Sequence, residues 1–454
     1  MEEKNTLLIL KTITSLLESK KYATLRDVLV TMNPADIAVI FEELEDNQIP
    51  LIFRLLPKEL AAETFVEMEV DNQELLIRGF SDNELKEVLD ELYLDDAVDI
   101  VEEMPANVVR RILANTHPDT RRMINEILKY PEDSAGSIMT VEYVSLRPSM
   151  TAKEAILRIR RTGIDKETVY TCYVMADDRR LLGIVTVKDL LLAEDDDLIA
   201  DIMDPNIIYV QTWEDQEDVA KKFDKYNFLA MPVVDEENRL VGIVTVDDAI
   251  DVLQDEATED AEKMAAINPT GSDKPYLKTS VFELWKARIP WLLVLMISAT
   301  FTGNIIMHYE SALGSMTVLS AFIPMLTGTG GNSGGQASAT VIRSLSLGDI
   351  EFKDIFRVIW KEIRVSVLCG VTLAVANFAK LMLIDRVQLL VALVVCLTLV
   401  VTVFFAKIIG SSLPLCAKKL GFDPAVLSSP FISTILDALS LIVYFQIATA
   451  LLPI

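Results

Sequence analysis

The chain has 454 residues and a formal net charge of −26 at pH 7, and 51% of its residues are hydrophobic. Residues 1–268 hold 58 acidic and 28 basic residues, a charge of −30, whereas the remainder holds 10 acidic and 14 basic residues, a charge of +4. A polyanionic first half argues against nucleic acid as a partner. It fits a cation-binding surface or a merely solubilising acidic one, and the length allows several domains.

The N-terminal residues "MEEKNTLLILKTITSLLESKK" are too polar and acidic for a signal peptide, so we expect the acidic half in the cytoplasm. Residues 33–128 then contain a repeat of 24 residues, in four units that begin at Asn33, Pro57, Ser81 and Pro105. Each unit opens on a proline or a helix-capping residue and continues with helical periodicity. Two short helices per unit would stack into a small superhelix.

A second repeat lies between residues 138 and 253. The segment "LLGIVTVKDLL" at 181–191 is similar to "LVGIVTVDDAI" at 240–250, and each pattern predicts a strand followed by a helix. The two units resemble a tandem CBS module, a family whose paired units often bind an adenine nucleotide. The resemblance implies nucleotide contacts from Thr186, Asp189, Thr245 and Asp248. Helix capping by the same residues explains them equally well.

Residues 251–267, "DVLQDEATEDAEKMAAI", have helical propensity and lead towards the first apolar block. Asp255, Glu256, Glu259 and Asp260 lie on this predicted connecting helix. Glu256 and Asp260 are four residues apart, so their like charges share one face and repel. A bound cation or a partner would relieve that repulsion, although a solvated acidic face remains an open alternative.

Beyond residue 285 we expect five membrane-spanning helices, at about 287–308, 313–341, 360–384, 387–411 and 426–452. The second and fifth contain prolines and polar residues, which lower their hydropathy. With a cytoplasmic N-terminus, twelve lysines and arginines lie at the inner ends, Lys407 among them, against Lys380 and Arg386 at the outer ends. This asymmetry predicts a multi-pass plasma (inner) membrane protein with its C-terminus outside.

The run "TGTGGNSGGQ" at 327–336 falls within the predicted second span. Its glycines allow close helix packing through small-xxx-small spacing. Alternatively, backbone carbonyls and the amides of Asn332 and Gln336 line a water-filled path, since irregular polar backbone is tolerated there. The polar residues around the glycines favour the lined path, and we name Thr327, Gly328, Gly331 and Asn332 as candidate pore residues.

Asp437 is flanked by apolar residues in the predicted fifth span. A carboxylate at that depth costs about 2.5–3.5 kcal/mol on the insertion scale. No lysine or arginine is expected at comparable depth to pair with it, so a transported cation is the simplest compensation; a protonated structural aspartate is the alternative. Carboxylate and neutral oxygens suit a hard ion, and Mg²⁺, which keeps several waters, fits best.

The order of these parts resembles the MgtE family of magnesium channels over nearly the whole chain, most specifically in Pro324–Gln336 and Ser428–Asp437. The resemblance implies a homodimeric Mg²⁺ channel whose pore is lined by the second and fifth spans, with Asp437 as the ion-binding carboxylate. It also implies closure by cytoplasmic Mg²⁺. The implied regulatory positions are Asp95, Asp99, Asp215, Glu217, Asp248, Glu256, Glu259 and Asp260.

We therefore predict a multidomain protein: an acidic α-helical superhelix of short repeats (1–130), an α/β tandem CBS module (131–253), a connecting helix and linker (254–284) and an all-α membrane domain of five transmembrane helices (285–454). Mg²⁺ is expected as the transported and regulatory ion, with ATP possible at the CBS module. No nucleophile–base pair or phosphate-binding loop indicates an enzyme. A proton-coupled transporter of Mg²⁺ or Co²⁺ and a membrane-tethered adenine-nucleotide sensor are the competing hypotheses.

Overall fold

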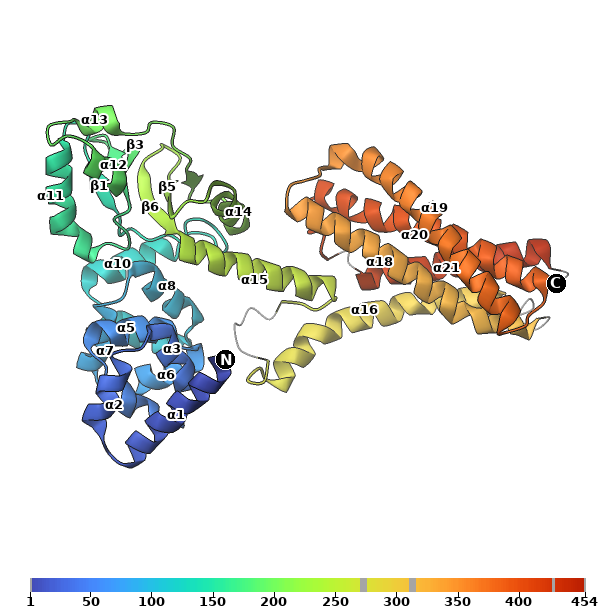
Figure 1. Cartoon of the computed structure of the whole chain (residues 1–454), viewed down its shortest axis with the longest axis horizontal. Coiled ribbons are helices and arrows are strands. Elements are labelled where there is room, and N and C mark those ends of the chain that lie inside the picture. The colour runs from blue at the N-terminus through green and yellow to red at the C-terminus, as the bar shows by residue number, and fades with distance from the viewer. Residues whose placement is uncertain (1, 270–275, 310–315, 427–428, 453–454) are drawn as a thin grey trace. The chain divides into compact units, whose positions relative to one another are not determined.

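The computed structural model describes residues 2–269, 276–309, 316–426 and 429–452. Two compact units make up the chain, Met1–Asp255 and Glu256–Ile454. Lys274, one of the twelve basic residues at the inner ends, and Ser428 of the second family motif lie outside the described residues, as do residues 313–315 of the predicted second span. The two units are described in turn (Figure 1).

Helices α1 (Glu2–Glu18) and α2 (Tyr22–Leu29) precede the helical repeats of the first unit. The first helices of the repeats are α3 (Pro34–Glu42), α5 (Lys58–Val66), α7 (Asp82–Leu89) and α9 (Ala106–Asn115). Their N-caps are Asn33, Pro57, Ser81 and Pro105, the four residues at which the predicted repeats begin. The second helices are α4 (Ile49–Phe53), α6 (Val70–Gly79), α8 (Leu94–Glu103) and α10 (Pro118–Ile127). The predicted superhelix is confirmed.

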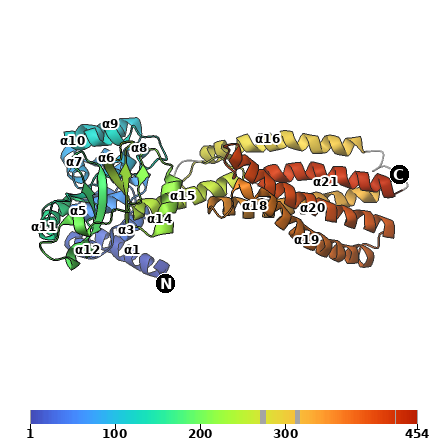
Figure 2. The same cartoon turned by 90° about the horizontal axis from the view of Figure 1, so that it is seen from above.

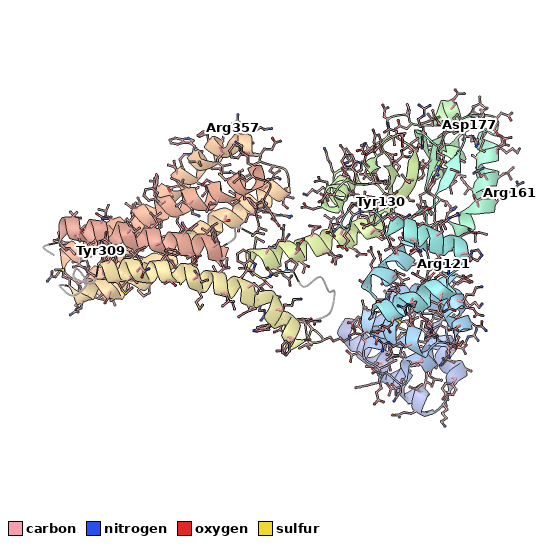
Figure 3. The ribbon with its side chains drawn as sticks, turned by 180° about the vertical axis from the view of Figure 1, so that it is seen from behind. Arg121, Tyr130, Arg161, Asp177, Tyr309 and Arg357 are labelled. Atoms are coloured by element: carbon pink, nitrogen blue, oxygen red, sulfur yellow. The ribbon has the colours of Figure 1, made fainter. Side chains whose placement is uncertain are left out.

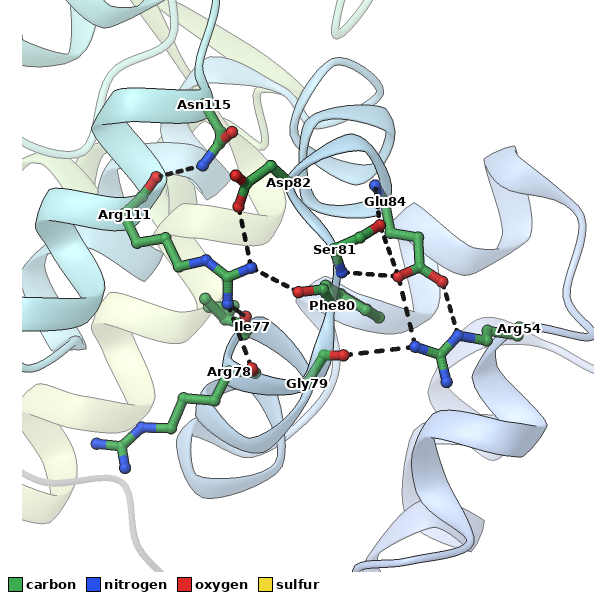
Figure 4. Close-up of polar contacts among 10 residues, drawn as sticks. All are labelled: Arg54, Ile77, Arg78, Gly79, Phe80, Ser81, Asp82, Glu84, Arg111 and Asn115. Atoms are coloured by element: carbon green, nitrogen blue, oxygen red, sulfur yellow. Dashed lines mark hydrogen bonds and ion pairs between the residues drawn. The ribbon is translucent and has the colours of Figure 1, made fainter.

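Arginines tie different repeats together (Figure 4). The Arg111 guanidinium on α9 donates to the carbonyl oxygens of Ile77 and Phe80 at the end of α6 and to the Asp82 carboxylate. Arg54 Nε lies 2.7 Å from Oε1 of Glu84, whose carboxylate also closes the capping box at the start of α7. These groups satisfy helix-terminal carbonyls that would otherwise lack a partner.

The CBS module consists of two equivalent halves. In the first, β1 (Val144–Leu146), β2 (Thr171–Met175) and β3 (Leu181–Thr186) form a sheet in that order; in the second, β4 (Val210–Gln211), β5 (Ala230–Val234) and β6 (Leu240–Thr245) do the same. Each sheet pairs its first two strands parallel and its last two antiparallel. The helical segments of the module are α11 (Ala152–Thr162), η1 (Gly163–Asp165), α12 (Val187–Leu192), α13 (Ile199–Ile202) and α14 (Gln216–Tyr226).

The module packs against the helical repeats in one continuous core that includes Phe41, Ile100, Met139 and Val244. Tyr130 lies between the repeats and the CBS module, whereas Asp177 lies at the far tip of the module (Figure 3). The connecting helix α15 runs from Val246 to Met264. The last helix of the second CBS half and the connecting helix are one continuous helix, and the division between the two units falls within it, after Asp255. The boundary at 254 stays a prediction.

The second unit is a bundle of long helices: α16 (Val281–His308), α18 (Ile323–Ser346), α19 (Ile355–Leu383), α20 (Leu389–Lys419) and α21 (Ser429–Leu451). Short 3₁₀ turns, η2 (Thr317–Phe322) and η3 (Phe352–Asp354), precede α18 and α19. Helix α18 packs against α20 and α21, α19 against α20, and α16 against α21, an arrangement that can be followed in Figure 2.

Four helical segments of the described residues are long and apolar enough to cross a membrane: Val281–His308, Phe352–Leu383, Leu389–Lys419 and Pro430–Leu451. Helix α18, which carries the glycine run, is not among them. Its low hydropathy follows from the polar residues noted in the sequence. The five helices match the five predicted segments in order, with ends that differ by up to about ten residues.

Candidate cation sites

A cluster of carboxylates forms where α8 meets the first turn of α15 and two loops of the CBS module. Asp95 and Asp96 open α8, Asp248 lies in the first turn of α15, and Glu142 and Glu167 come from the loops. Asp95 is buried, and its Oδ1 accepts a hydrogen bond of 3.1 Å from the backbone amide of Asp96. Oε2 of Glu142 lies 3.4 Å from the amide nitrogen of Leu94. We call these five residues the acidic cluster.

Burial and mutual repulsion shift the cluster towards protonation. Burial, with the charges of Asp248 and Asp247, raises the pKa of Asp96 to about 7. Burial and the neighbouring carboxylates raise the pKa of Glu167 to about 8, and burial raises that of Asp248 to about 6. The pKa of Asp95 is also raised, chiefly by burial and then by Asp248. A group of carboxyls that resists losing its protons would ionise more readily beside a divalent cation.

The structure brings together some of the regulatory candidates and not others. Asp95 and Asp248 belong to the acidic cluster. Asp99 follows on α8, and its side chain reaches solvent. Partial removal of water by neighbouring groups, and then the charge of Asp248, raise the pKa of Asp99. Asp215 instead caps α14, accepting a hydrogen bond of 2.9 Å from the amide of Glu217. Within the described ranges, no three His, Cys, Asp or Glu side chains converge closely enough to hold a metal ion.

The remaining candidates lie farther along α15, in the second unit. Glu259 forms an ion pair with Lys263 one turn later. The Lys263 ammonium also lies 2.7 Å from Oδ2 of Asp423, in the segment between α20 and α21. These two carboxylates therefore already share a cation supplied by the chain, while Glu256 and Asp260 take part in other interactions.

The candidate nucleotide residues act as helix caps. Thr186 and Asp189 form a capping box at the start of α12, and the Oγ1 atoms of Thr186 and Thr245 donate to Asp189 and Asp248 over 2.5 and 2.6 Å. The capping interpretation is thus confirmed for Thr186 and Asp189, and Asp248 also accepts a hydrogen bond of 3.3 Å from the backbone amide of Thr245. Of the four candidate nucleotide residues, Thr186 alone also lines a cavity of about 830 Å³ between the two CBS halves. Its polar lining includes Tyr170, Lys188, Asp204, Asn206 and Asn227.

The glycine run of α18 is helical throughout, and Gly330, Gly331 and Gly334 pack against α20 or α21. A Cβ atom on Gly330 would lie 2.8 Å from Oγ of Ser440 and 2.9 Å from Cγ2 of Thr402. A Cβ atom on Gly410 would overlap the backbone of Gly334. The backbone is therefore regular rather than irregular, and the small residues let the three helices approach closely. That the amides of Asn332 and Gln336 line a water-filled path stays a prediction.

The other face of α18 carries the amides. Pro324, Gly328, Asn332 and Gln336, spaced four residues apart, are exposed within the chain, whereas Gly331 is buried beside Ser433. Thr327 is half-buried and donates to the carbonyl oxygen of Ile323 over 3.0 Å. We call the four exposed residues the amide stripe; of the candidate pore residues, Gly328 and Asn332 belong to it, and Thr327 and Gly331 do not.

Asp437 lies eight residues into α21, immediately after the buried Leu436. Its side chain is half-buried, and among the described residues no hydrogen bond or ion pair engages its carboxylate. The charge expected in the fifth helix is thus in place, and no described residue forms a hydrogen bond or ion pair with it.

Lys407 is a functional candidate that the sequence analysis missed. It was assigned to the cytoplasmic end of its helix, but it lies twelve residues before the end of α20, roughly 18 Å along the axis. Its side chain is only 6% exposed, and no described residue forms a hydrogen bond or ion pair with it. A buried lysine at such depth costs about 2.5–3.5 kcal/mol on the insertion scale. The burial of Lys407 becomes visible only when the helices are packed together, and the hydropathy of the sequence does not indicate it.

Comparison with known proteins accounts for all three parts of the chain. The family models described as "MgtE intracellular N domain" and "CBS domain" match residues 32–133 and residues 135–196 and 199–255. The model for MgtE, described as "Divalent cation transporter", matches residues 323–447. The magnesium transporter MgtE of Thermus thermophilus is 38% identical over 432 residues, which cover 94% of this chain and 95% of that protein.

The chain belongs to the MgtE family. The magnesium transporter MgtE of Bacillus subtilis is 34% identical over 435 residues, covering 96% of this chain and 95% of that protein. The MgtE family consists of membrane transporters rather than enzymes, in agreement with the absence of a catalytic motif from the sequence.

Two solved structures resemble the first unit. The cytosolic domain of the Mg²⁺ channel MgtE in complex with ATP is 37% identical, with a TM-score of 0.51, and the match covers 54% of this chain and 99% of that one. The soluble part of a magnesium transporter is 30% identical, with a TM-score of 0.52, covering 56% and 99%. The helical N domain followed by the CBS pair is therefore the MgtE arrangement.

Proposed function

We propose that the protein is a Mg²⁺-selective channel that imports magnesium across the plasma membrane. The observation that carries this function is the Asp437 carboxylate, half-buried and unengaged by any described residue of an apolar bundle. A divalent cation would compensate that charge. The names of the two bacterial relatives support Mg²⁺ as the ion, and carboxylate and amide oxygens suit a hydrated Mg²⁺.

The channel would be a homodimer with five spans in each subunit. Helix α18, the second in chain order, would cross the membrane together with the four apolar segments. The amide stripe supports both points, because amides exposed at membrane depth need water or protein against them. A second copy facing the stripe would enclose a water-filled path. In this arrangement the N-terminal domains are cytoplasmic and the C-terminus lies outside, as the distribution of basic residues predicts.

Cytoplasmic Mg²⁺ would close this channel by binding at the acidic cluster. Like carboxylates held together are costly to ionise, and a divalent ion relieves that cost. Mg²⁺ would therefore favour the conformation that brings the carboxylates together, shifting the equilibrium by its differential affinity. The other candidate positions, Asp99, Asp215, Glu217, Glu256, Glu259 and Asp260, would add negative charge elsewhere on the cytoplasmic side.

The cavity beside Thr186 supports ATP as a second, modulating ligand. It joins apolar walls to polar groups, as ligand pockets usually do, and a 37% identical cytosolic domain was solved with ATP. In the competing hypothesis of a nucleotide sensor, the same pocket would be the main site and the helices a mere anchor.

Uptake and current measurements on reconstituted protein test the channel. Asp437→Asn keeps the size of the side chain and removes its charge, so Mg²⁺ uptake should fall at least tenfold, about 1.4 kcal/mol. Asp385→Asn, whose carboxylate pairs with Lys380 beyond the end of α19, is the matched control and should transport normally. Wild-type uptake by a folded Asp437→Asn variant overturns the proposal.

Two further readouts separate the alternatives. A channel gives discrete single-channel currents, whereas a proton-coupled transporter gives saturable uptake that depends on the pH gradient. Replacement of Glu259 and Asp260 by alanine should leave conduction intact and raise the cytoplasmic Mg²⁺ concentration needed for closure. Closure at an unchanged concentration would place the regulatory site elsewhere, and ATP binding without ion flux would favour the sensor.

A further inference from the structure

The membrane unit holds two opposite charges, Lys407 and Asp437, that no described residue engages. We propose that Lys407 is the counter-charge of the ion-binding carboxylate: it balances Asp437 while no divalent cation is bound and opposes the cation once it arrives. Lys407 would thereby keep binding weak and release fast. This inference rests on the proposed role of Asp437 as the cation site.

Packing places the two residues in one region of the bundle. Ala406 and Leu436, which directly precede them, belong to the same buried cluster with Ile432. Both also surround Gly334: a Cβ atom there would lie 3.3 Å from the carbonyl oxygen of Ala406 and would overlap Cδ1 of Leu436. Axes of packed helices are about 8–10 Å apart, so the residues that follow these two positions lie in neighbouring parts of the same pair of helices.

Depth along the helices agrees with this placement. Lys407 lies roughly 18 Å from the C-terminal end of α20, and Asp437 lies roughly 12 Å from the N-terminal end of α21. These two ends flank the short segment 420–428, so they lie on the same side of the bundle. The offset is about the length of a lysine side chain.

Simpler roles for Lys407 fit less well. A lysine that anchors a helix at the lipid surface extends its ammonium into water, but this side chain is only 6% exposed. A structural lysine would donate to nearby carbonyls, as Lys418 does to the carbonyl oxygen of Leu345 over 3.1 Å. No such bond engages Lys407 within the described part of the chain.

The counter-charge has a measurable consequence for transport. An ion that binds too tightly leaves slowly, so conduction requires attraction that is only moderate. A fixed ammonium near the carboxylate reduces the attraction for a divalent ion and lowers the cost of an empty site. Loss of the ammonium should strengthen binding and slow release.

The test measures Mg²⁺ uptake into proteoliposomes of the full-length protein as a function of external Mg²⁺. In Lys407→Met the concentration for half-maximal uptake should fall about fivefold and the maximal rate about threefold, while Lys407→Arg, which keeps the charge, should stay within about twofold of wild type. Lys361→Met removes an exposed lysine of α19 and should change neither value.

The same change is then made with Asp437→Asn. With the carboxylate gone, Lys407→Met should alter the residual uptake less than about twofold, since coupled sites are not additive. Equal effects in both backgrounds, or wild-type kinetics of folded Lys407→Met, overturn the inference. If the methionine variant does not fold, Lys407→Gln is held to the same two criteria. Normal uptake by Asp437→Asn alone overturns the proposed function instead.

Discussion

The two units bury charge in opposite ways. The cytoplasmic unit gathers carboxylates of like sign in the acidic cluster, and their pKa values rise together. The membrane unit isolates single charges, Lys407 and Asp437, among apolar and small residues. Cations relieve the repulsion within a crowded group of like charges, so the stability of the fold around that group depends on ion concentration. A single charge instead interacts with one ion at a time. The first arrangement suits a site that senses cation concentration, and the second suits a path along which single ions pass.

The strongest contrast is expected from the tight packing of the membrane unit. Gly410→Val places a branched side chain on the backbone of Gly334, so α18 and α20 must separate. Overpacking of this kind costs about 1–3 kcal/mol or more, and we expect the yield of folded protein to fall at least fivefold. Gly303→Val on α16, where nothing lies within 4 Å, should fold normally. Equal yields, judged by size-exclusion profiles, would contradict the packing role of the glycines.

The acidic cluster should make its own unit sensitive to pH. Folded pKa values of about 7 for Asp96, 8 for Glu167 and 6 for Asp248 lie above the ordinary carboxyl values. The folded state therefore binds more protons than the unfolded state, and stability is lost as pH rises from about 4 to 8.

Hydrogen exchange of α8 measures this loss in the full-length protein. After correction for intrinsic rates, protection should fall about tenfold between pH 6 and pH 8 without divalent ions, and Mg²⁺ should restore most of it. Protection that does not change with pH in the absence of Mg²⁺ would show that these carboxyls titrate normally.

A matched pair of variants separates cluster repulsion from helix capping. Asp248 and Asp189 each accept a hydrogen bond from a threonine at a helix start, but only Asp248 belongs to the acidic cluster. Asp189→Asn should cost up to about 1 kcal/mol through a weaker cap. Asp248→Asn at pH 8 without Mg²⁺ should raise stability by about 1 kcal/mol, because a repelling charge is removed. Denaturant unfolding with equal losses in both variants would exclude the repulsion.

The smallest effect is expected at the surface of the helical repeats. Arg54 and Glu84 form an ion pair of 2.7 Å with both side chains more than a third exposed. Glu84→Gln should cost about 0.2–1 kcal/mol, with less effect at high salt. A larger loss that persists in 1 M salt would mean that the capping box at Ser81, rather than the ion pair, carries the contribution.

Local signals predicted the repeats well and the charged sites poorly. Asn33, Pro57, Ser81 and Pro105 occupy the N-cap positions of their helices as their spacing indicated, because helix starts depend on neighbours in the sequence. The two matching halves of the CBS module could be predicted for the same reason, because similar local sequences form similar strands and helices.

The remaining features depend on tertiary packing. Glu142 and Glu167 join Asp95 and Asp248 only after folding, so no spacing rule groups them. The predicted span ends at 411, whereas α20 continues to Lys419, so Lys407 lies deeper in its helix than the sequence indicates. The backbone at Gly330 and Gly334 was expected to be irregular, but close neighbours on α20 and α21 keep it helical.

The unbroken course of α15 has a mechanical consequence. Its nineteen residues form a rod of about 28 Å whose first turn carries Asp248 and whose last turn carries Lys263. A tilt of about 10° at the first turn would displace the last by about 5 Å, close to the rise of one helical turn. A flexible linker would absorb such a tilt, whereas a single helix acts as a lever arm that amplifies it. A change of sub-ångström size at the first turn thus becomes a movement of several ångströms at Lys263, the residue that contacts Asp423.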